Sequence, residues 1–480
     1  MTRDAASKSD AATRFDAPWL ASAAGGVVLH AGSTPISGGA VDSRLVSEGV
    51  CFFALPGERT DGHRFLEAAV QAGAGALVIS AELEPERLDA LADGGRVTVV
   101  AVADVAAALR AVAAAYRDRF EPLVVGITGS LAKTSTKEQI AEVLEEGFEV
   151  LRNPANWNNE IGLPMTLLRL RPEHRIAVLE MGLYTTGEIA LLAGLARPSI
   201  GVVTAVRGVH LSRAGSIEAI EAGKRELVEA LPADGWAILN ADDERVRRMA
   251  DHTVAQVRTY GFAADADVRA TNVVSLGKEG MRFTLHVGRD SYEVSTPVLG
   301  RHGVHNALAA VAVADRAGLD IADIITGLAR PLQMPHRSQL VAAGPWTILD
   351  DSYNASPDAV LAALDLLSEL PGRHIAVLGE MLELGDSAAA EHRRVGEHAA
   401  AVDRLVVVGE GARGIAEGAI ERGLDAGSVH VVADRDEALT VLLGELQDDD
   451  SILVKASRGA ALDLLVERLV LAGGAGEARA

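Results

Sequence analysis

The stretch "LVVGITGSLAKTSTKEQ" (residues 123–139) limits the possible folds of this chain more than any other. Its apolar first half predicts a buried strand, and the apolar residues at helical spacing beyond it predict a helix that ends near Gly147. A strand, a Gly/Ser/Thr turn and a helix that begins at Lys-Thr form an arrangement that binds phosphate. Backbone N–H groups of the turn point at the anion, and the helix dipole favours negative charge there. The sequence therefore predicts an α/β unit with a phosphate site at its turn.

The turn departs from the strict phosphate-loop pattern G-x-x-x-x-G-K-S/T, because Ile127 and Ala132 occupy its two glycine positions. The residues alone therefore leave two interpretations open, a phosphate site and an ordinary strand–helix turn. In the first, Lys133 neutralises phosphate charge and Thr134 offers its hydroxyl to Mg²⁺. The methyl group of Ala132 costs little in a right-handed or extended backbone, and about 1 kcal/mol where φ is positive.

Short apolar strands alternate with helices along most of the 480 residues. We expect an α/β fold with mostly parallel sheets, because helices that join parallel strands cover the sheet faces. The pattern divides the chain into a disordered tail at 1–16 and three domains at 17–120, 121–333 and 334–480. The third domain is expected to be a second open sheet of the Rossmann-like kind.

Composition narrows the classes of function. The formal net charge of −22 argues against nucleic-acid binding, for which a basic stripe is expected. The single cysteine, Cys51, lies in an apolar run and is expected to be a buried structural thiol in a reducing compartment. No apolar run reaches the length of a membrane span, and the N-terminus lacks the apolar core of a signal peptide. These features predict a cytoplasmic protein without membrane insertion.

Further motifs follow the phosphate loop in an order that resembles the Mur ligase family of ATP-dependent amide-bond-forming enzymes, from about residue 40 to residue 470. That family carries T-G-S-x-G-K-T-S/T at the loop, so the present loop matches it except at Ala132. At the N-terminus, "DSR" (42–44) and "GERTDGH" (57–63) resemble segments that hold a uridine nucleotide. The other matching stretches are "NWNNEIGLPMTLL" (156–168), "LEMGLYTTGEI" (179–189), "HLSRAGSIEAIEAGKREL" (210–227), "LNADD" (239–243), "DDSYNASPDA" (350–359), "VLGEMLELG" (377–385) and "LVKASR" (453–458).

The resemblance implies a fold of three domains: a UDP-substrate domain, a central P-loop ATPase domain with a parallel sheet, and a Rossmann-like C-terminal domain that binds the incoming amine. It implies that ATP phosphorylates a carboxylate and that an amine attacks the acyl phosphate, with ATP and Mg²⁺ as cofactors. Within the family, "DDSYNASPDA" and "VLGEMLELG" point to the addition of D-alanyl-D-alanine to UDP-N-acetylmuramoyl-tripeptide in peptidoglycan precursor synthesis. We expect a monomer that acts on these two small-molecule substrates.

Four residues depart from the family pattern at positions that the resemblance places near the nucleotide or metal. Ala132 and His336 replace glycines, Ala205 replaces an asparagine, and Ser212 replaces an acidic residue. They motivate two competing hypotheses. One is a related ligase that joins a different carboxylate and amine; the other is a non-catalytic protein that binds the precursor.

The resemblance assigns catalytic roles to Lys133, Glu180, His210 and Lys224, and metal binding to Thr134, Glu180, His210 and a carbamate formed on Lys224. Glu180 ends an apolar strand, where an acidic residue faces the ligand crevice of a parallel sheet; a solvated strand-end carboxylate is the alternative. His210 follows another strand, although magnesium prefers oxygen ligands. Lys224 lies in a polar helix and would pass for a surface lysine without the resemblance.

The binding residues implied by the resemblance form two groups. The ATP group comprises Gly129, Ser130, Leu131, Ala132, Lys133, Thr134, Ser135, Asn306, Arg337 and Asp351. The substrate group comprises Ser43, Arg44, Asp61, Gly62, His63, Asn158, Asn159, Tyr353, Asn354, Lys455, Ser457 and Arg458.

Three of these assignments have a structural alternative. Asp351 would reach the ribose or order the hinge. Lys455, Ser457 and Arg458 would grip the dipeptide carboxylate or form an interdomain salt bridge. Asn158 and Asn159 would bind a sugar–peptide substrate or cap a loop.

Overall fold

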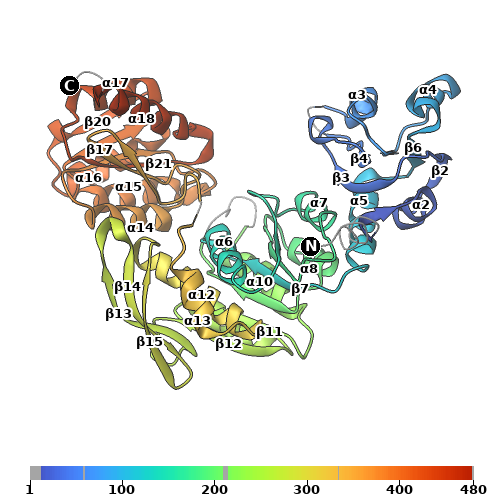
Figure 1. Ribbon diagram of the computed structural model, residues 1–480. Coiled ribbons are helices and arrows are strands. Elements are labelled where there is room, and N and C mark those ends of the chain that lie inside the picture. Colours follow the sequence, from blue (N-terminus) through green and yellow to red (C-terminus); the bar gives the residue numbers. More distant parts are fainter. Residues whose placement is uncertain (1–11, 58–59, 209–214, 333, 478–480) are drawn as a thin grey trace.

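The computed structural model describes residues 12–57, 60–208, 215–332 and 334–477. Three β-sheets follow one another along the chain, and each is covered by helices (Figure 1). The units form a V, with the central sheet at its base and the N-terminal and C-terminal sheets in its two arms (Figure 1). The α/β class predicted from the sequence is confirmed.

The N-terminal sheet has six strands in the order β1-β3-β4-β5-β6-β2. Strands β3 to β6 are parallel, and the two edge strands are antiparallel to their neighbours. Its strands are β1 (Arg14–Phe15), β2 (Val27–His30), β3 (Ile36–Ala40), β4 (Val50–Phe53), β5 (Ala76–Ile79) and β6 (Thr98–Ala101). Its helices are α2 (Ala17–Ala24), α3 (Leu66–Gln71), α4 (Pro85–Leu91) and α5 (Val105–Arg117).

The disordered tail predicted through residue 16 is too long. Arg14 and Phe15 pair with Ser37 and Ile36 of β3, and Phe15 is 7% exposed. Its ring packs on Trp19 and on Tyr116 of α5. Burial of these aromatic rings thus orders a segment that was predicted from its polar composition to be disordered.

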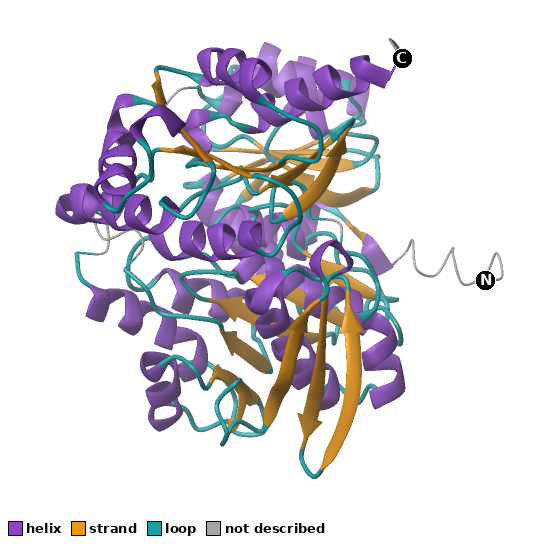
Figure 2. Cartoon of the chain, turned by 90° about the vertical axis from the view of Figure 1, so that its left-hand side faces the viewer, coloured by secondary structure: helices purple, strands orange, loops and turns teal. Residues whose placement is uncertain are grey.

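The central sheet has nine strands in the order β15-β14-β13-β12-β11-β10-β7-β9-β8. Its strands are β7 (Leu123–Thr128), β8 (Val150–Arg152), β9 (Ile176–Glu180), β10 (Ile200–Val203), β11 (Trp236–Asn240), β12 (Gln256–Gly261), β13 (Val268–Ser275), β14 (Met281–Val287) and β15 (Asp290–Thr296). Its helices are α6 (Lys133–Leu144), α7 (Gly162–Leu167), α8 (Glu188–Ala196), α10 (Ile217–Glu229), α11 (Glu244–Arg247), α12 (Gly300–Arg316) and α13 (Ile321–Leu328). The antiparallel strands β14 and β15 extend the parallel sheet at one edge, and their long arrows are plain in Figure 2.

The C-terminal sheet has six strands in the order β16-β17-β21-β18-β19-β20, and only β16 is antiparallel to its neighbour. Its strands are β16 (Gln339–Ala343), β17 (Trp346–Asp350), β18 (His374–Gly379), β19 (Arg404–Val408), β20 (Val429–Val432) and β21 (Ser451–Lys455). Its helices are α14 (Pro357–Ser368), α15 (Ala388–Ala399), α16 (Arg413–Glu421), α17 (Arg435–Glu445) and α18 (Asp463–Glu477).

The register of the central sheet brings three strand ends together. Ile127 of β7 lies beside Glu180 of β9, and Thr128 lies beside Val203 of β10. Because carboxyl ends of parallel strands meet at one edge of a sheet, the loops after these strands share a crevice. The phosphate loop predicted from the sequence is the first of them.

Candidate active site

The loop after β7 is held by the segment that follows β10. Gly129 has φ of 152°, and a Cβ at this position would lie 1.8 Å from Oγ1 of Thr204. Ser130 donates its N–H to the carbonyl of Ala205 at 2.7 Å and its hydroxyl to the carbonyl of Arg207 at 2.9 Å. The loop therefore needs glycine at 129, and it is fixed to that segment on one side before α6 begins.

Ala132 adopts the left-handed conformation, with φ of 61° and ψ of 3°, directly before α6. Of the two backbone possibilities weighed from the sequence, the costly one is present, at about 1 kcal/mol for a residue with a Cβ. His336, for which the resemblance also implies a glycine, has φ of 61° too. Both residues thus adopt a backbone conformation that favours glycine, at the expense of strain.

Lys133, Thr134 and Glu180 form one cluster at the mouth of this loop. The Lys133 ammonium donates to the carbonyl of Gly129 at 2.7 Å. The Thr134 hydroxyl donates to Oε2 of Glu180 at 2.8 Å, and the amide of Asn158 donates to Oε1 at 2.7 Å. Glu180 is 2% exposed, and within the described residues no cation forms a salt bridge with it. A buried carboxylate and a hydroxyl so close together are oxygen donors of the type that Mg²⁺ takes alongside water and phosphate.

Lys224 is buried on the inner face of α10, where it is 3% exposed. The sequence-based interpretation as a surface residue is wrong, because Ile220, Lys224 and Leu227 follow one another at helical spacing on the face that packs on the sheet. Burial, and secondarily the charge of Lys133, holds the pKa of Lys224 well below its ordinary value. Burial also lowers the pKa of Lys133, although Glu180 opposes the shift. The two lysines thus lie close enough for the charge of Lys133 to discourage protonation of Lys224.

A cavity of about 300 Å³ lies between α6, α12 and the segment before β16. Three predicted ATP contacts line it: Ser135, Asn306 and Arg337. Sequence reasoning missed two other lining residues, Gln139 and His302. A signal was available, since Gln139 lies one helical turn after Ser135 and His302 one turn before Asn306, which puts each pair on one face. Burial lowers the pKa of His302, so a neutral imidazole is favoured there.

The hinge before β16 is held by carboxylates at the end of β17. Asp351 accepts the N–H of Ser338 at 3.0 Å and the ammonium of Lys455 at 2.5 Å. His336 Nδ1 lies 2.8 Å from Oδ2 of Asp350. In this arrangement Asp351 orders the hinge, which is one of the two roles considered for it.

The three candidates for a dipeptide carboxylate site differ in accessibility. Lys455 is 3% exposed and also donates to the carbonyl of Asn354 at 3.0 Å. Ser457 is 5% exposed, and its hydroxyl oxygen accepts the N–H of Leu382 at 2.9 Å. Arg458 is exposed and donates to the hydroxyl of Tyr353 at 3.2 Å. Lys455 forms its ion pair with Asp351 within the C-terminal unit, so this pair is not an interdomain bridge. Binding of the dipeptide carboxylate by Lys455 stays a prediction.

The candidate uridine segments lie in the N-terminal unit. Ser43 and Arg44 begin a 3₁₀ turn that Asp42 caps, and the Arg44 side chain pairs with Asp42 at 2.6 Å. Gly62 and His63 begin another such turn, which Asp61 caps.

The tautomer of His63 follows from its two contacts. The backbone N–H of Ser80 donates to Nε2 at 3.0 Å, so Nδ1 carries the proton and donates to Asp61 at 2.7 Å. His63 is thereby fixed in orientation at the carboxyl end of β5.

The remaining predicted residues are distributed as follows. Asn159 accepts the N–H of Gly162 at 2.8 Å, which is the loop-capping alternative. Leu131 accepts the hydroxyl of Thr204 through its carbonyl at 2.6 Å. His210 and Ser212 lie outside the described residues.

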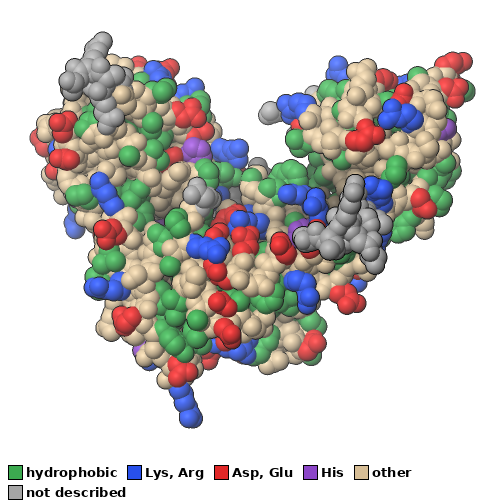
Figure 3. Space-filling view, in the orientation of Figure 1, with side chains coloured by type: hydrophobic (Ala, Val, Ile, Leu, Met, Phe, Trp, Pro, Cys, Tyr) green, Lys and Arg blue, Asp and Glu red, His purple; other side chains and the backbone are tan. Residues whose placement is uncertain are grey.

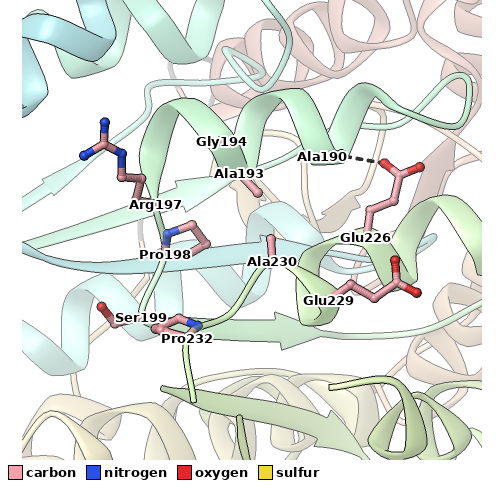
Figure 4. Close-up of a pocket in the computed structure, with 10 residues that line it drawn as sticks. All are labelled: Ala190, Ala193, Gly194, Arg197, Pro198, Ser199, Glu226, Glu229, Ala230 and Pro232. Atoms are coloured by element: carbon pink, nitrogen blue, oxygen red, sulfur yellow. Dashed lines mark hydrogen bonds between the residues drawn. The ribbon is translucent and has the colours of Figure 1, made fainter. Parts of the chain in front are cut away.

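A larger groove of about 540 Å³ lies between α8 and α10, on the flank of the central unit (Figure 4). Glu226 bounds it and accepts the N–H groups of Gly187 at 2.6 Å and Ala190 at 2.9 Å. None of the residues predicted for catalysis or binding lines it. The Glu226 carboxylate thus accepts hydrogen bonds from backbone N–H groups at the start of α8, which is a structural role.

The phosphate loop on a parallel sheet, with its lysine, hydroxyl and buried carboxylate, defines a P-loop protein with two further α/β units. Family profiles agree along the chain: "Mur ligase family, catalytic domain" matches residues 35–117, "Mur ligase middle domain" 127–314 and "Mur ligase, glutamate ligase domain" 336–458. The chain belongs to the Mur ligase family.

Individual relatives are similar over nearly the full length. The UDP-N-acetylmuramoyl-tripeptide–D-alanyl-D-alanine ligase of Mycobacterium tuberculosis is 39% identical over 469 residues, which cover 89% of this chain and 91% of the relative. A crystal structure of MurF from Acinetobacter baumannii matches with a TM-score of 0.84 and 30% identity, over 95% of this chain and 99% of the other. The MurF ligase of Thermotoga maritima in complex with ADP matches with a TM-score of 0.80 and 26% identity, over 92% and 99%.

Two further observations bear on the environment of the protein. Within the described ranges, every helix is too short or too polar to cross a membrane. On the face drawn in Figure 3, acidic and basic side chains are interspersed, and the surface is hollowed between the two arms of the V.

Proposed function

We propose that the chain is an ATP-dependent ligase that joins D-alanyl-D-alanine to UDP-N-acetylmuramoyl-tripeptide. The observation that carries this proposal is the similarity to relatives of that name at 39% identity over nine-tenths of the chain. The phosphate loop with Lys133, Thr134 and Glu180 supports it, because the reaction begins with transfer of a phosphoryl group.

In the first step, a carboxylate oxygen of the tripeptide substrate attacks the γ-phosphorus of ATP, and ADP leaves. The carboxylate becomes an acyl phosphate, whose phosphate is a far better leaving group than oxide. Lys133, at the start of α6, neutralises charge on the β- and γ-phosphates together with the N–H groups of the loop. Its present bond to the Gly129 carbonyl keeps the ammonium at the loop until phosphate oxygens replace that acceptor.

In the second step, the amine of D-alanyl-D-alanine attacks the acyl carbon, an amide forms, phosphate leaves, and the amine loses its proton. Arg458, exposed beside Tyr353, is the candidate to bind the carboxylate of the dipeptide, since a guanidinium can hold a carboxylate with two hydrogen bonds. Closure of the units around both substrates would exclude water from the acyl phosphate.

Thr134 and Glu180 would hold Mg²⁺, which supplies charge neutralisation at the phosphate oxygens. Asn158 orients the Glu180 carboxylate. Lys224 is proposed to carry a carbamate: its lowered pKa favours the neutral amine that reacts with carbon dioxide. The carbamate would turn this buried amine into an oxygen ligand beside Lys133. His210 is proposed for the same metal region on resemblance alone.

The proposed division of labour follows the units. Residues 17–120 would bind the uridine end of the substrate through Ser43, Arg44 and His63, residues 121–333 ATP, and residues 334–480 the incoming dipeptide. We propose that the protein acts as a monomer in the cytoplasm, where both small substrates would reach it.

The test is release of ADP by the purified chain with ATP, Mg²⁺, UDP-N-acetylmuramoyl-tripeptide and D-alanyl-D-alanine, with each component omitted in turn. We expect release that requires every component and a product whose mass equals that of both substrates minus water. ATP binding without turnover on these substrates, but turnover on another carboxylate and amine, would favour the related-ligase hypothesis. Absence of both would favour the non-catalytic one.

Variants of basic residues sharpen the test. Lys133→Ala should lower turnover by at least about 100-fold, because charge stabilisation at the transferred phosphoryl group is lost. Arg289→Ala, in the exposed turn between β14 and β15, is the control and should retain turnover. Carbon-13 bicarbonate should give a carbamate resonance in the wild type and none in Lys224→Ala.

A further inference from the structure

Gln139 is a buried polar side chain whose amide has no evident role in stabilising the fold. It lies in α6 with 0% exposure, and among the residues that the structure describes neither its amide oxygen nor its amide nitrogen has a hydrogen-bond partner. Its polar neighbours on the helix are paired: Thr136 donates to Asn306 at 3.0 Å, and Lys137 to the carbonyl of Asn153 at 2.6 Å. An unpaired buried amide costs free energy in the empty protein, so it calls for a partner from outside the chain.

The cavity beside Gln139 has the character of a site for a flat heteroaromatic ring. Its volume is about 300 Å³, and Gln139 forms part of its wall. Apolar side chains line one part of it, among them Val298, Leu299 and Leu340, and polar side chains, among them Gln139 and Asn306, line the rest. Pockets of this type hold a ligand by apolar contact and fix its orientation through a small number of polar groups.

The other two side-chain amides in the cavity, those of Asn306 and Gln339, already use their oxygen atoms as hydrogen-bond acceptors. The oxygen of Asn306 already accepts the Thr136 hydroxyl, so the free part of that amide is its NH₂ group, a donor. The oxygen of Gln339 accepts the N–H of His336 at 3.2 Å. Gln139 retains both a free acceptor and a free donor, which the other two side-chain amides do not.

We propose that Gln139 determines base specificity at the nucleotide site by recognising a 6-aminopurine. Its amide oxygen accepts from the exocyclic N6–H group, and its amide N–H donates to the ring nitrogen N7, the pairing by which glutamine recognises adenine. A rotation of the Gln139 side chain brings the amide into the cavity. A 6-oxopurine presents an acceptor where adenine presents a donor, and it leaves the Gln139 oxygen unpaired.

This inference rests on the proposed function, in that the cavity receives the base of ATP. It predicts that one substitution has opposite effects on the stability of the protein and on its affinity for ATP. Gln139→Leu removes the unpaired amide and should raise the melting temperature of the nucleotide-free protein. The same change removes the contact with N6 and should weaken ATP binding.

The experiment measures dissociation constants for Mg-ATP and Mg-ITP by calorimetry, and the melting temperature without nucleotide. The wild type should prefer ATP, and Gln139→Leu should lose about tenfold in ATP affinity with little change for ITP, because one base-reading amide is removed. Gln139→Met, an unbranched side chain of similar length, should behave alike and serves if the leucine variant folds poorly. Gln256→Leu, at the exposed start of β12, is the control and should leave both affinities unchanged.

The outcomes distinguish a failure of the proposed role of Gln139 from a failure of the proposed ligase function. Equal ATP and ITP affinities in the wild type, or an unchanged preference in both Gln139 variants, would overturn the role of Gln139 while the ligase proposal stands. A wild type that binds neither nucleotide would remove the proposed function, and this inference with it. Reduced ATP affinity with a higher melting temperature in the same variant supports the inference, since a purely structural glutamine would not separate the two.

Discussion

At the scale of single residues, Ala132 and His336 are two of the non-glycine residues whose positive φ favours glycine. Ala132 and His336 both have φ of 61°, one at the phosphate loop and one at the hinge. His336 has compensating contacts, since its ring pairs with Asp350 and its carbonyl accepts the N–H of Tyr353 at 3.1 Å. Ala132 has no side-chain hydrogen bond of this kind, so the strain there is the easier one to relieve.

We therefore expect Ala132→Gly to stabilise the protein. Relief of positive φ should raise the free energy of unfolding by about 1 kcal/mol at most, because greater freedom of the unfolded chain offsets part of it. Urea unfolding measures this change, and the KM for ATP should fall or stay constant. The matched control, Ala141→Gly in the middle of α6, should destabilise by about 1 kcal/mol. Destabilisation by both variants would mean that the left-handed loop causes no strain.

The buried ammonium of Lys224 predicts a particular pH dependence. Its pKa in the folded protein lies well below the ordinary 10.5, mainly through burial. Between the lowered pKa and 10.5, the unfolded chain binds a proton at Lys224 that the folded chain does not. The free energy of unfolding should therefore rise with pH across that window. Below the window both states are protonated, and the penalty of burial is present in full.

Lys224→Met tests this dependence because it keeps the bulk and removes the titrating group. Urea unfolding at about pH 7.5 and about pH 9.5 should show a smaller rise in stability for the variant than for the wild type. Lys278→Met is a comparison at a lysine whose ammonium donates to Thr347 at 2.6 Å, and it should keep the wild-type slope. Equal slopes in all three proteins would contradict the buried, proton-poor state of Lys224.

At the scale of secondary-structure elements, local signals predicted β7, its loop and α6, because the pattern of each lies within a few residues. The sequence also placed Glu180 at the end of β9. It did not reveal that Lys224 is buried, although Ile220 and Leu227 flank it on the same helix face. Neither did it find Gln139, whose importance arises from α12 packing on α6, a contact between residues far apart in the sequence. The antiparallel strands β14 and β15 were missed, although β14 alternates apolar and polar residues from Met281 to Val287, which is the pattern of a half-buried strand.

Glu180, at the end of β9 beside β7, accepts hydrogen bonds from Thr134 and Asn158, and these contacts predict the effect of Glu180→Gln. The amide keeps the shape and can still accept from Thr134, but it opposes the donor of Asn158 and is a poorer Mg²⁺ ligand. Turnover should fall by about 100-fold or more, the loss typical of a removed charged contact to a phosphoryl group. The melting temperature should change little or rise, because the substitution removes the charge of a buried carboxylate that forms no salt bridge within the described residues. Glu279→Gln, exposed in the turn before β14, is the control for turnover.

At the scale of the whole molecule, the predicted site residues are divided among three units. His63 lies in the N-terminal unit, Lys133 and Glu180 in the central unit, and Arg458 in the C-terminal unit. Within the ranges that the structure describes, few polar contacts join the central and C-terminal units. Arg207, next to the phosphate loop, lies 3.6 Å from Asp358 at the start of α14, and Lys278 reaches Thr347. Such exposed pairs contribute little stability, so they leave the two units free to reorient.

The arms of the V should therefore close when nucleotide and UDP-substrate bind together. Ligation requires the acyl phosphate at Lys133 and the amine held by the C-terminal unit to meet, and closure would exclude water from both. Small-angle X-ray scattering should show a smaller radius of gyration with a non-hydrolysable ATP analogue and UDP-N-acetylmuramoyl-tripeptide than with neither. Asp358→Ala, which removes the contact of Arg207 across the two units but leaves its ion pair with Asp243, should leave the closed dimension unchanged and alter only the open one. An unchanged radius in the wild type, with both ligands shown to be bound, would mean that catalysis proceeds across the present arrangement and that the V is the working form.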